Sequence, residues 1–335
     1  MANRFDALID QFDPVLRKAF LDSIYRIRET AQIEQIARML EKGDIEGAIR
    51  ACGLDPALFR PYNIALLRAF EAGGDFIARS LPPALTPGGL RLIVNFDVRN
   101  PSAEDWLRGH SSRRVTEIVQ DQRTMIRNTL SEGISQGLNP RSVALDLVGR
   151  IGESGKREGG LIGLTSSQAE WVKAYEAELA SDKPSASLAR ALRDKRFDAA
   201  VRRAEKTGTP IPAETRRKMV AAYKNRALRY RAETIGRTEA MAALHQSQDE
   251  AAQQGLDANA IQVENLKMVW RTAGDRRVRD SHRSMNGQAV AKGDLFTTGT
   301  GAKLRFPGDP NGPPHEIINC RCYRELKYDF LAGVR

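Results

Sequence analysis

The most distinctive part of the sequence reads Val269-Trp-Arg-Thr-Ala-Gly-Asp-Arg-Arg-Val-Arg-Asp-Ser-His282 and, after a proline-rich loop, His315-Glu-Ile-Ile-Asn-Cys-Arg-Cys-Tyr323. Two of the three cysteines and two of the four histidines fall between residues 269 and 323. Short β-prone pieces, glycines and prolines fill the remainder of this stretch, whereas the preceding sequence is largely helical and charged in character. The sequence therefore predicts a small, loop-rich C-terminal unit.

So small a unit has little hydrophobic core of its own and needs a further constraint. Four side chains offer two imidazoles and two thiolates, the ligand set of a structural tetrahedral zinc site: His282, His315, Cys320 and Cys322. The Cys-x-Cys spacing is tighter than the common Cys-x2-Cys, so no standard zinc finger is matched. The sequence predicts a structural zinc site at these residues. The alternative is that the two cysteines are buried thiols, that His282 forms a hydrogen bond with a loop carbonyl, and that His315 is exposed.

The rest of the chain is predicted to be helical. Apolar residues recur at spacings of three and four from about residue 5, as in Leu16, Phe20, Ile24 and Ile27, which indicates amphipathic helices. We predict a fold that is mainly α with a small α+β, loop-rich C-terminal unit. The predicted domains are an N-terminal helical arm or bundle (1–80), a linker rich in proline and glycine (81–89), a helical body (90–260) and the C-terminal unit (261–330).

A long helix is predicted from Pro212 towards Gly255. Gly236 in its interior costs about 1 kcal/mol relative to alanine, which suggests a kink or close packing against another backbone. We predict that Arg237 is a buried, hydrogen-bonded side chain that braces the C-terminal unit. Glu239 and Asp275 are also assigned structural roles, although Glu239 in a solvent-facing position is equally consistent with the sequence.

The positive charge of the chain is concentrated in one segment. The net charge is +10, and residues 183–237 alone contain 16 Lys or Arg against 5 Asp or Glu. Such clustering predicts a surface that neutralises the nucleic-acid backbone without reading its sequence, and a solvated helical face is the alternative. The predicted nucleic-acid-binding residues are Arg190, Arg193, Lys195, Arg196, Arg202 and Arg203.

The sequence also limits the compartment. Three cysteines, two of them one residue apart, form no disulfide framework and favour a reducing environment. The first residues, Met-Ala-Asn-Arg-Phe-Asp, do not resemble a signal peptide. Membrane association is not expected, because no apolar run approaches the roughly 18 residues of a spanning helix.

Several short motifs together resemble the phage head morphogenesis family, the phage Mu F-like minor head proteins that associate with the portal. The motifs are Arg237-Thr-Glu239, then Trp270 with Asp275, Arg277-Val-Arg279 and His282, and finally Asn319-Cys-Arg-Cys322. The resemblance spans roughly residues 96–323. It implies a virion protein of the head and portal vertex, present in the host cytoplasm during assembly, and not an enzyme. The implied partners are the portal protein, major capsid or scaffolding proteins, and non-specifically bound phage DNA.

Two other functions are consistent with the sequence. One is an enzyme carried in the virion, either a metal-dependent nuclease or a transferase that uses Arg237 and Glu239. It would require a pocket with a perturbed acid or base, which a sequence does not reveal. The other is a pure interaction module, in which the first 90 residues bind the portal and the remainder is a scaffold.

Overall fold

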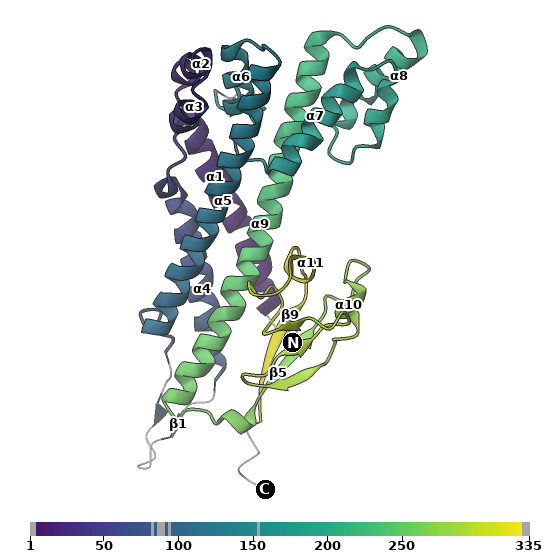
Figure 1. Cartoon of the computed structure of the whole chain (residues 1–335). Coiled ribbons are helices and arrows are strands. Elements are labelled where there is room, and N and C mark those ends of the chain that lie inside the picture. The colour runs from purple at the N-terminus through teal and green to yellow at the C-terminus, as the bar shows by residue number, and fades with distance from the viewer. Residues whose placement is uncertain (1–4, 82–83, 86–90, 93–94, 153–154, 330–335) are drawn as a thin grey trace. The chain divides into compact units, whose positions relative to one another are not determined.

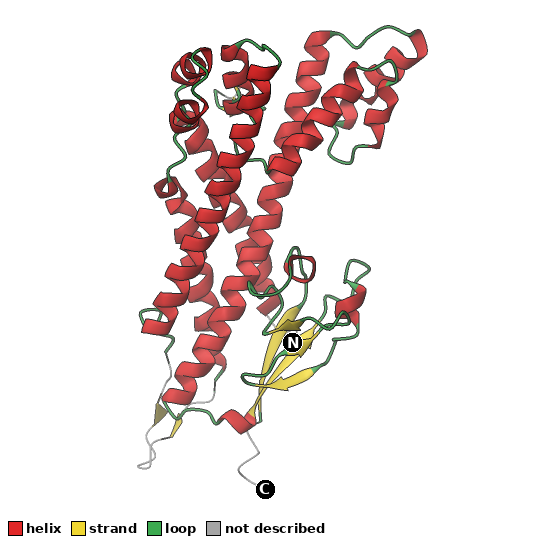
Figure 2. Cartoon of the chain, viewed as in Figure 1, coloured by secondary structure: helices red, strands yellow, loops and turns green. Residues whose placement is uncertain are grey.

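Helices make up most of the structure, and the strands concentrate near the C-terminus (Figure 2). The computed structural model describes residues 5–81, 84–85, 91–92, 95–152 and 155–329. The helical body and the strand-containing C-terminal unit confirm the predicted fold class, mainly α with a small α+β unit. Most of the predicted linker, residues 81–89, lies outside the described residues.

The elements are labelled in chain order (Figure 1). The α-helices are α1 (Phe5–Thr30), α2 (Ile33–Glu41), α3 (Ile45–Ala51), α4 (Arg60–Ser80), α5 (Pro101–Ser135), α6 (Pro140–Val148), α7 (Ser166–Ala180), α8 (Asp198–Thr207), α9 (Ala213–Asp257), α10 (Asp280–Arg283) and α11 (Pro314–Ile317). The strands are β1 (Ala84–Leu85), β2 (Arg91–Leu92), β3 (Arg150–Ile151), β4 (Arg157–Glu158), β5 (Leu266–Arg271), β6 (Ala289–Ala291), β7 (Phe296–Thr297), β8 (Lys303–Leu304) and β9 (Tyr323–Tyr328).

Contacts between residues group the chain into two units, each built from separate stretches. Unit 1 contains residues 1–20, 62–112 and 233–335, and unit 2 contains residues 21–61 and 113–232. Helices α1, α4, α5 and α9 contribute residues to both units. Each unit is therefore discontinuous in sequence, and the predicted domain bounds stay a prediction.

Unit 1 contains the C-terminal sheet, in which β5 is the central strand. The strand order is β6-β5-β9, and both pairings are antiparallel. Trp270 on β5 lies opposite Arg324 on β9 and is completely buried. Its ring packs edge-on against Phe296 on β7, with centroids 5.3 Å apart. A single large aromatic residue thus forms the centre of this small core.

Within unit 1, α9 packs closely against α1 at Gly236. A Cβ atom at this position would lie 2.7 Å from the carbonyl oxygen of Asp13 and 2.9 Å from the backbone nitrogen of Arg17. Such short separations leave no room for a methyl group, so glycine is required here by the approach of a second backbone. The close packing predicted for Gly236 is confirmed.

Unit 2 is organised around the turn that precedes α7. The buried guanidinium of Arg28 donates to the carbonyl oxygens of Gly160 and Ile162. Arg231 on α9 donates to the carbonyl of Gly163, which has a φ of 102°. Gln122 on α5 accepts a hydrogen bond from the amide of the same glycine at 2.6 Å. These polar side chains satisfy a backbone that would otherwise be buried without partners.

Candidate metal centre and basic segment

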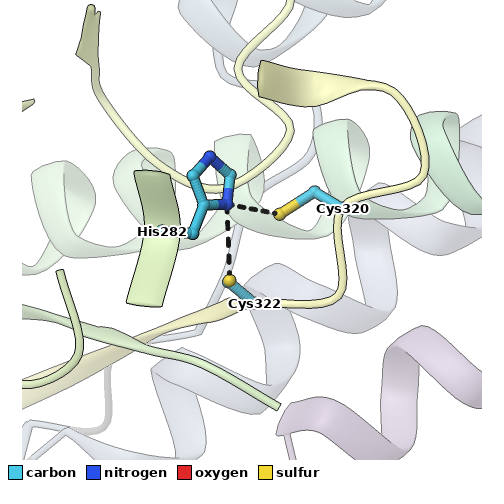
Figure 3. A group of neighbouring side chains, drawn as sticks. All are labelled: His282, Cys320 and Cys322. Atoms are coloured by element: carbon cyan, nitrogen blue, oxygen red, sulfur yellow. Dashed lines mark hydrogen bonds between the residues drawn. The ribbon is translucent and has the colours of Figure 1, made fainter. Parts of the chain in front are cut away.

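Three of the four predicted zinc ligands come together in unit 1. His282 lies on α10, and Cys320 and Cys322 lie in the short connection between α11 and β9. All three side chains are buried, and their ligand atoms lie within 4.8 Å of one another. Both sulfur atoms face the same ring nitrogen of the histidine (Figure 3).

The distances fit a zinc ion. The Nδ1 atom of His282 lies 3.4 Å from Sγ of Cys320 and 3.6 Å from Sγ of Cys322. Zn–S bonds of about 2.3 Å and Zn–N bonds of about 2.0 Å in a tetrahedral site place sulfur and nitrogen roughly 3.5 Å apart. Both sulfurs therefore lie at separations from this nitrogen that suit ligands of one tetrahedral ion.

The two thiols interact strongly. A hydrogen bond from Cys322, supported by His282, lowers the pKa of Cys320 even though burial opposes its ionisation. The Cys320 sulfur, together with burial, raises the pKa of Cys322. The pair by itself therefore favours one negative charge. A coordinated zinc ion would deprotonate both thiols. Neither Cys320 nor Cys322 forms a disulfide, so both sulfurs are available as ligands.

Glu316 is a further member of this site that the sequence analysis did not identify. Its carboxylate is almost fully buried, and Oε2 lies 2.9 Å from Nε2 of His282. Burial would raise the pKa of Glu316, but hydrogen bonds from Thr300 and Ser281 and the nearby imidazole lower it overall. Glutamate is common on protein surfaces. Only its position next to a predicted ligand histidine could have drawn attention to it.

His315 does not join the cluster. Its side chain is 69% exposed, whereas that of Glu316 is 1% exposed. The two residues are adjacent on α11, where successive side chains point about 100° apart. Only one of them can face the centre, and the structure places Glu316 there. The prediction of His315 as a fourth ligand is therefore corrected.

Two of the motifs that carry the family resemblance, Arg237-Thr-Glu239 and Asn319-Cys-Arg-Cys322, contact each other in unit 1. Arg237 on α9 donates from Nε to the carbonyl oxygen of Cys320 at 3.2 Å and lies 3.4 Å from Asp13 on α1. Its side chain is 22% exposed, so the predicted full burial is corrected to partial burial. The amide of Asn319 donates to the hydroxyl of Thr238 at 3.3 Å. Asn319 has a φ of 56°, a left-handed conformation that asparagine tolerates better than most residues. The backbone before Cys322 is thus held directly against α9.

Glu239 and Asp275 occupy different surroundings. Glu239 is buried in unit 1, and Oε2 lies 2.7 Å from Nε2 of His110 on α5. Asp275 is partly exposed and forms an ion pair with Arg321, which lies between the two cysteines. Burial opposes ionisation of Asp275, but hydrogen bonds from the Arg277 amide and the Arg321 guanidinium lower its pKa. Each of these acids is held by a neighbouring side chain.

Most of the predicted nucleic-acid-binding arginines are already paired with acids in unit 2. Arg190 pairs with Glu178, and Arg196 pairs with Asp194. Asp198 lies 3.0 Å from Arg193 and 4.0 Å from Arg202. Among the described contacts, no ion pair engages the exposed Lys195 or Arg203. The clustered charge is therefore partly compensated by acids on neighbouring helices and turns.

Among the residues that the structure describes, no helix combines the length and the hydrophobicity that crossing a membrane requires.

A family model matches part of the chain. No curated protein and no solved structure matches the chain significantly. Residues 195–324 match the model of a family described as Phage Mu protein F like protein. This range contains Arg237, the whole of β5 and all three residues of the His–Cys–Cys cluster. The match confirms, over residues 195–324, the resemblance to the phage Mu F-like head morphogenesis family.

Proposed function

We propose that this chain is a phage minor head protein that acts in head assembly at the portal vertex. The observation that carries the proposal is the family match over residues 195–324, which supports a role in phage head morphogenesis. A protein of this kind belongs in the virion and acts as a structural component rather than as an enzyme. Its proposed partners are the portal protein, the major capsid or scaffolding proteins, and phage DNA.

The proposed cofactor is a structural zinc ion held by His282, Cys320 and Cys322. The buried donor set and the sulfur–nitrogen distances of 3.4 and 3.6 Å support this assignment. A zinc ion there would tie α10 to the start of β9 and so close the loop-rich unit. Three protein ligands leave one position of a tetrahedral ion for a water molecule or another ligand.

The proposed DNA contact uses the exposed part of the basic segment. Lys195 and Arg203 are the predicted residues whose charges no described ion pair compensates. Binding through such groups depends on counterion release, so it would be independent of sequence and would weaken steeply with added salt. The paired arginines would contribute less, because a contact with phosphate requires them to give up their carboxylates.

Head assembly can be tested in the phage that encodes the chain. We expect that deleting its gene gives few or aberrant heads by electron microscopy, and that a copy supplied from a plasmid restores them. We also expect the tagged whole chain to co-purify with the portal protein of the same phage. Normal, DNA-filled heads in the deletion strain would refute the assembly role, and failure to co-purify would refute the portal contact.

DNA contact can be tested by charge reversal in the whole chain. We expect Lys195→Glu/Arg203→Glu to weaken duplex binding at low salt and to reduce the slope of log affinity against log salt by about 1 per lost phosphate contact. The matched control is Lys42→Glu/Arg60→Glu, which changes the net charge equally at two exposed positions elsewhere in unit 2. If both double variants weaken DNA binding equally, the loss reflects net charge alone, and the proposed contact at Lys195 and Arg203 is refuted.

A further inference from the structure

The imidazole of His282 lies between two different kinds of partner. Its Nδ1 atom faces the sulfurs of Cys320 and Cys322, at 3.4 and 3.6 Å. Its Nε2 atom lies 2.9 Å from Oε2 of Glu316, although the N–H is not aligned with the oxygen as a hydrogen bond. A histidine that binds a metal through one nitrogen usually donates the hydrogen on the other to a carboxylate or carbonyl. Here the carboxylate of Glu316 lies at that second nitrogen, in a close ionic contact and not in an aligned hydrogen bond.

Glu316 is itself held in place by hydroxyl groups. Ser281, the residue before His282, donates from its hydroxyl to Oε2 at 2.8 Å, and Thr300 donates to Oε1 at 2.5 Å. The Thr300 turn is fixed to α10 as well, because the amide of Gly299 donates to the carbonyl oxygen of Ser281 at 2.8 Å. Each carboxylate oxygen therefore has a hydroxyl donor, and the position of Glu316 relative to α10 is set from two sides.

The geometry separates Glu316 from the ligands themselves. Among the described histidines, cysteines and acids, the group whose ligand atoms are all mutually close contains only His282, Cys320 and Cys322. The carboxylate contacts the ring nitrogen that faces away from the sulfurs. It is thus placed to act on the ion through the imidazole and not by direct coordination.

We propose that Glu316 is a positioning residue that keeps the hydrogen of His282 on Nε2 and so directs the Nδ1 lone pair toward an ion between Cys320 and Cys322. This proposal rests on the zinc centre proposed above. It assigns Nδ1 as the ligand atom, and it gives Ser281 and Thr300 the task of holding the carboxylate. It also explains why α11 places the glutamate, and not His315, on the inner side.

The zinc readout compares Glu316→Gln with His315→Gln, the same type of replacement at the exposed neighbour. We expect Glu316→Gln to weaken zinc binding roughly 10- to 100-fold, the usual loss when such a carboxylate is removed, whereas His315→Gln should bind as wild type. Affinity is measured by competition with a chromophoric chelator. Wild-type affinity in Glu316→Gln, or an equal loss in His315→Gln, would overturn the positioning role.

The tautomer readout does not depend on zinc. The chain has four histidines, so ¹⁵N-histidine labelling gives a spectrum simple enough to assign with single His→Gln variants. In the metal-free whole protein we expect Nε2 of His282 to carry a hydrogen, whether or not Nδ1 also carries one beside the Cys320 sulfur, and we expect Glu316→Gln to weaken this preference. A wild-type Nε2 without a hydrogen would overturn the proposal.

Two further results keep the possible failures distinct. If Glu316→Gln does not fold, Thr300→Val removes one hydroxyl donor to the carboxylate, and we expect a smaller loss of zinc affinity in the same direction. Undiminished affinity in that variant would count against the proposal. If the wild type binds no zinc, the zinc proposal fails, but the tautomer of the metal-free protein still decides whether Glu316 positions the ring.

Discussion

The carboxylate of Glu239 on α9 lies 2.7 Å from Nε2 of His110 on α5, and each side chain is only 2% exposed. The indole of Trp106 stacks on the imidazole, with centroids 4.6 Å apart and planes inclined by 7°. Phe70 on α4 stacks in turn on Trp106, at 5.2 Å. A polar contact between two helices is thus enclosed in an aromatic cluster, where water cannot replace either partner.

We expect Glu239→Gln to lower the free energy of unfolding by about 1–3 kcal/mol, because a buried partner loses its charged acceptor. The matched control is Glu233→Gln on the same helix, whose partner Arg17 is 3.5 Å away and whose side chain is 56% exposed. Such surface pairs contribute about 0–1 kcal/mol. Thermal unfolding of both variants measures the difference, and equal melting temperatures would contradict a stabilising role for the His110 contact.

Because His245 is buried, the free energy of unfolding should decrease at acidic pH. Burial, and secondarily the charge of Arg324, lowers the pKa of His245 to about 3 from its ordinary value of 6.5. As the pH falls below 6.5, the unfolded chain gains a proton that the folded chain does not. The free energy of unfolding should therefore decrease by about 1.4 kcal/mol per pH unit from this residue, until about pH 3.

His245→Gln tests that slope while retaining an acceptor for the Arg324 amide, which donates to Nε2 at 3.1 Å. Chemical denaturation from pH 7 to pH 4 should show a shallower pH dependence in this variant than in the wild type. His315→Gln, which removes an exposed histidine, should not share the effect. An unchanged slope in His245→Gln would show that other groups cause the acid sensitivity.

Gly236→Ala should destabilise the contact of α1 with α9. An added methyl group would meet the backbone of Asp13 and Arg17 at less than 3 Å, and overpacking of this kind costs about 1–3 kcal/mol. Gly109→Ala is the control, because Gly109 is exposed on α5 and a Cβ there meets nothing within 4 Å. In that position alanine should stabilise the helix by up to about 1 kcal/mol. Opposite shifts in melting temperature are expected.

Removal of the thiols should remove the metal. We expect elemental analysis of the purified wild type to find about one zinc ion per chain, and Cys320→Ser/Cys322→Ser to contain almost none and to melt at a lower temperature. Cys52→Ser should retain zinc, since Cys52 lies in unit 2 and donates to the carbonyl of Ala48. A metal-free wild type with normal folding would refute the zinc proposal.

Periodicity and residue type were enough to predict the helical body and much of the candidate centre. Close packing at Gly236 could be predicted because glycine inside a long helix lowers helix stability relative to alanine. A glycine in that position therefore suggests a specific packing reason. His282, Cys320 and Cys322 could be identified because thiols and imidazoles are scarce in this chain. The remaining parts of the site depend on which way each side chain points, and residue type does not determine that direction.

His315 and Glu316 illustrate that limit. They are neighbours in sequence, and a four-residue helix has no apolar periodicity that would reveal which one faces inward. The basic segment shows a second limit. Its charge count is correct, but the compensation of Arg190 by Glu178 and of Arg196 by Asp194 depends on local chain geometry. A count along the sequence cannot separate free cations from paired ones.

The discontinuous composition of the two units has a consequence for genetics. A fragment of residues 1–80 takes chain from both units, and any fragment that ends before residue 233 lacks the last stretch of unit 1. No single cut in the polypeptide releases either unit intact. A truncation that passes residue 20 from the N-terminus, or residue 233 from the C-terminus, would therefore remove chain from both units and would make unrelated activities disappear together. Partner sites on this chain are better mapped with single surface substitutions in the uncut polypeptide.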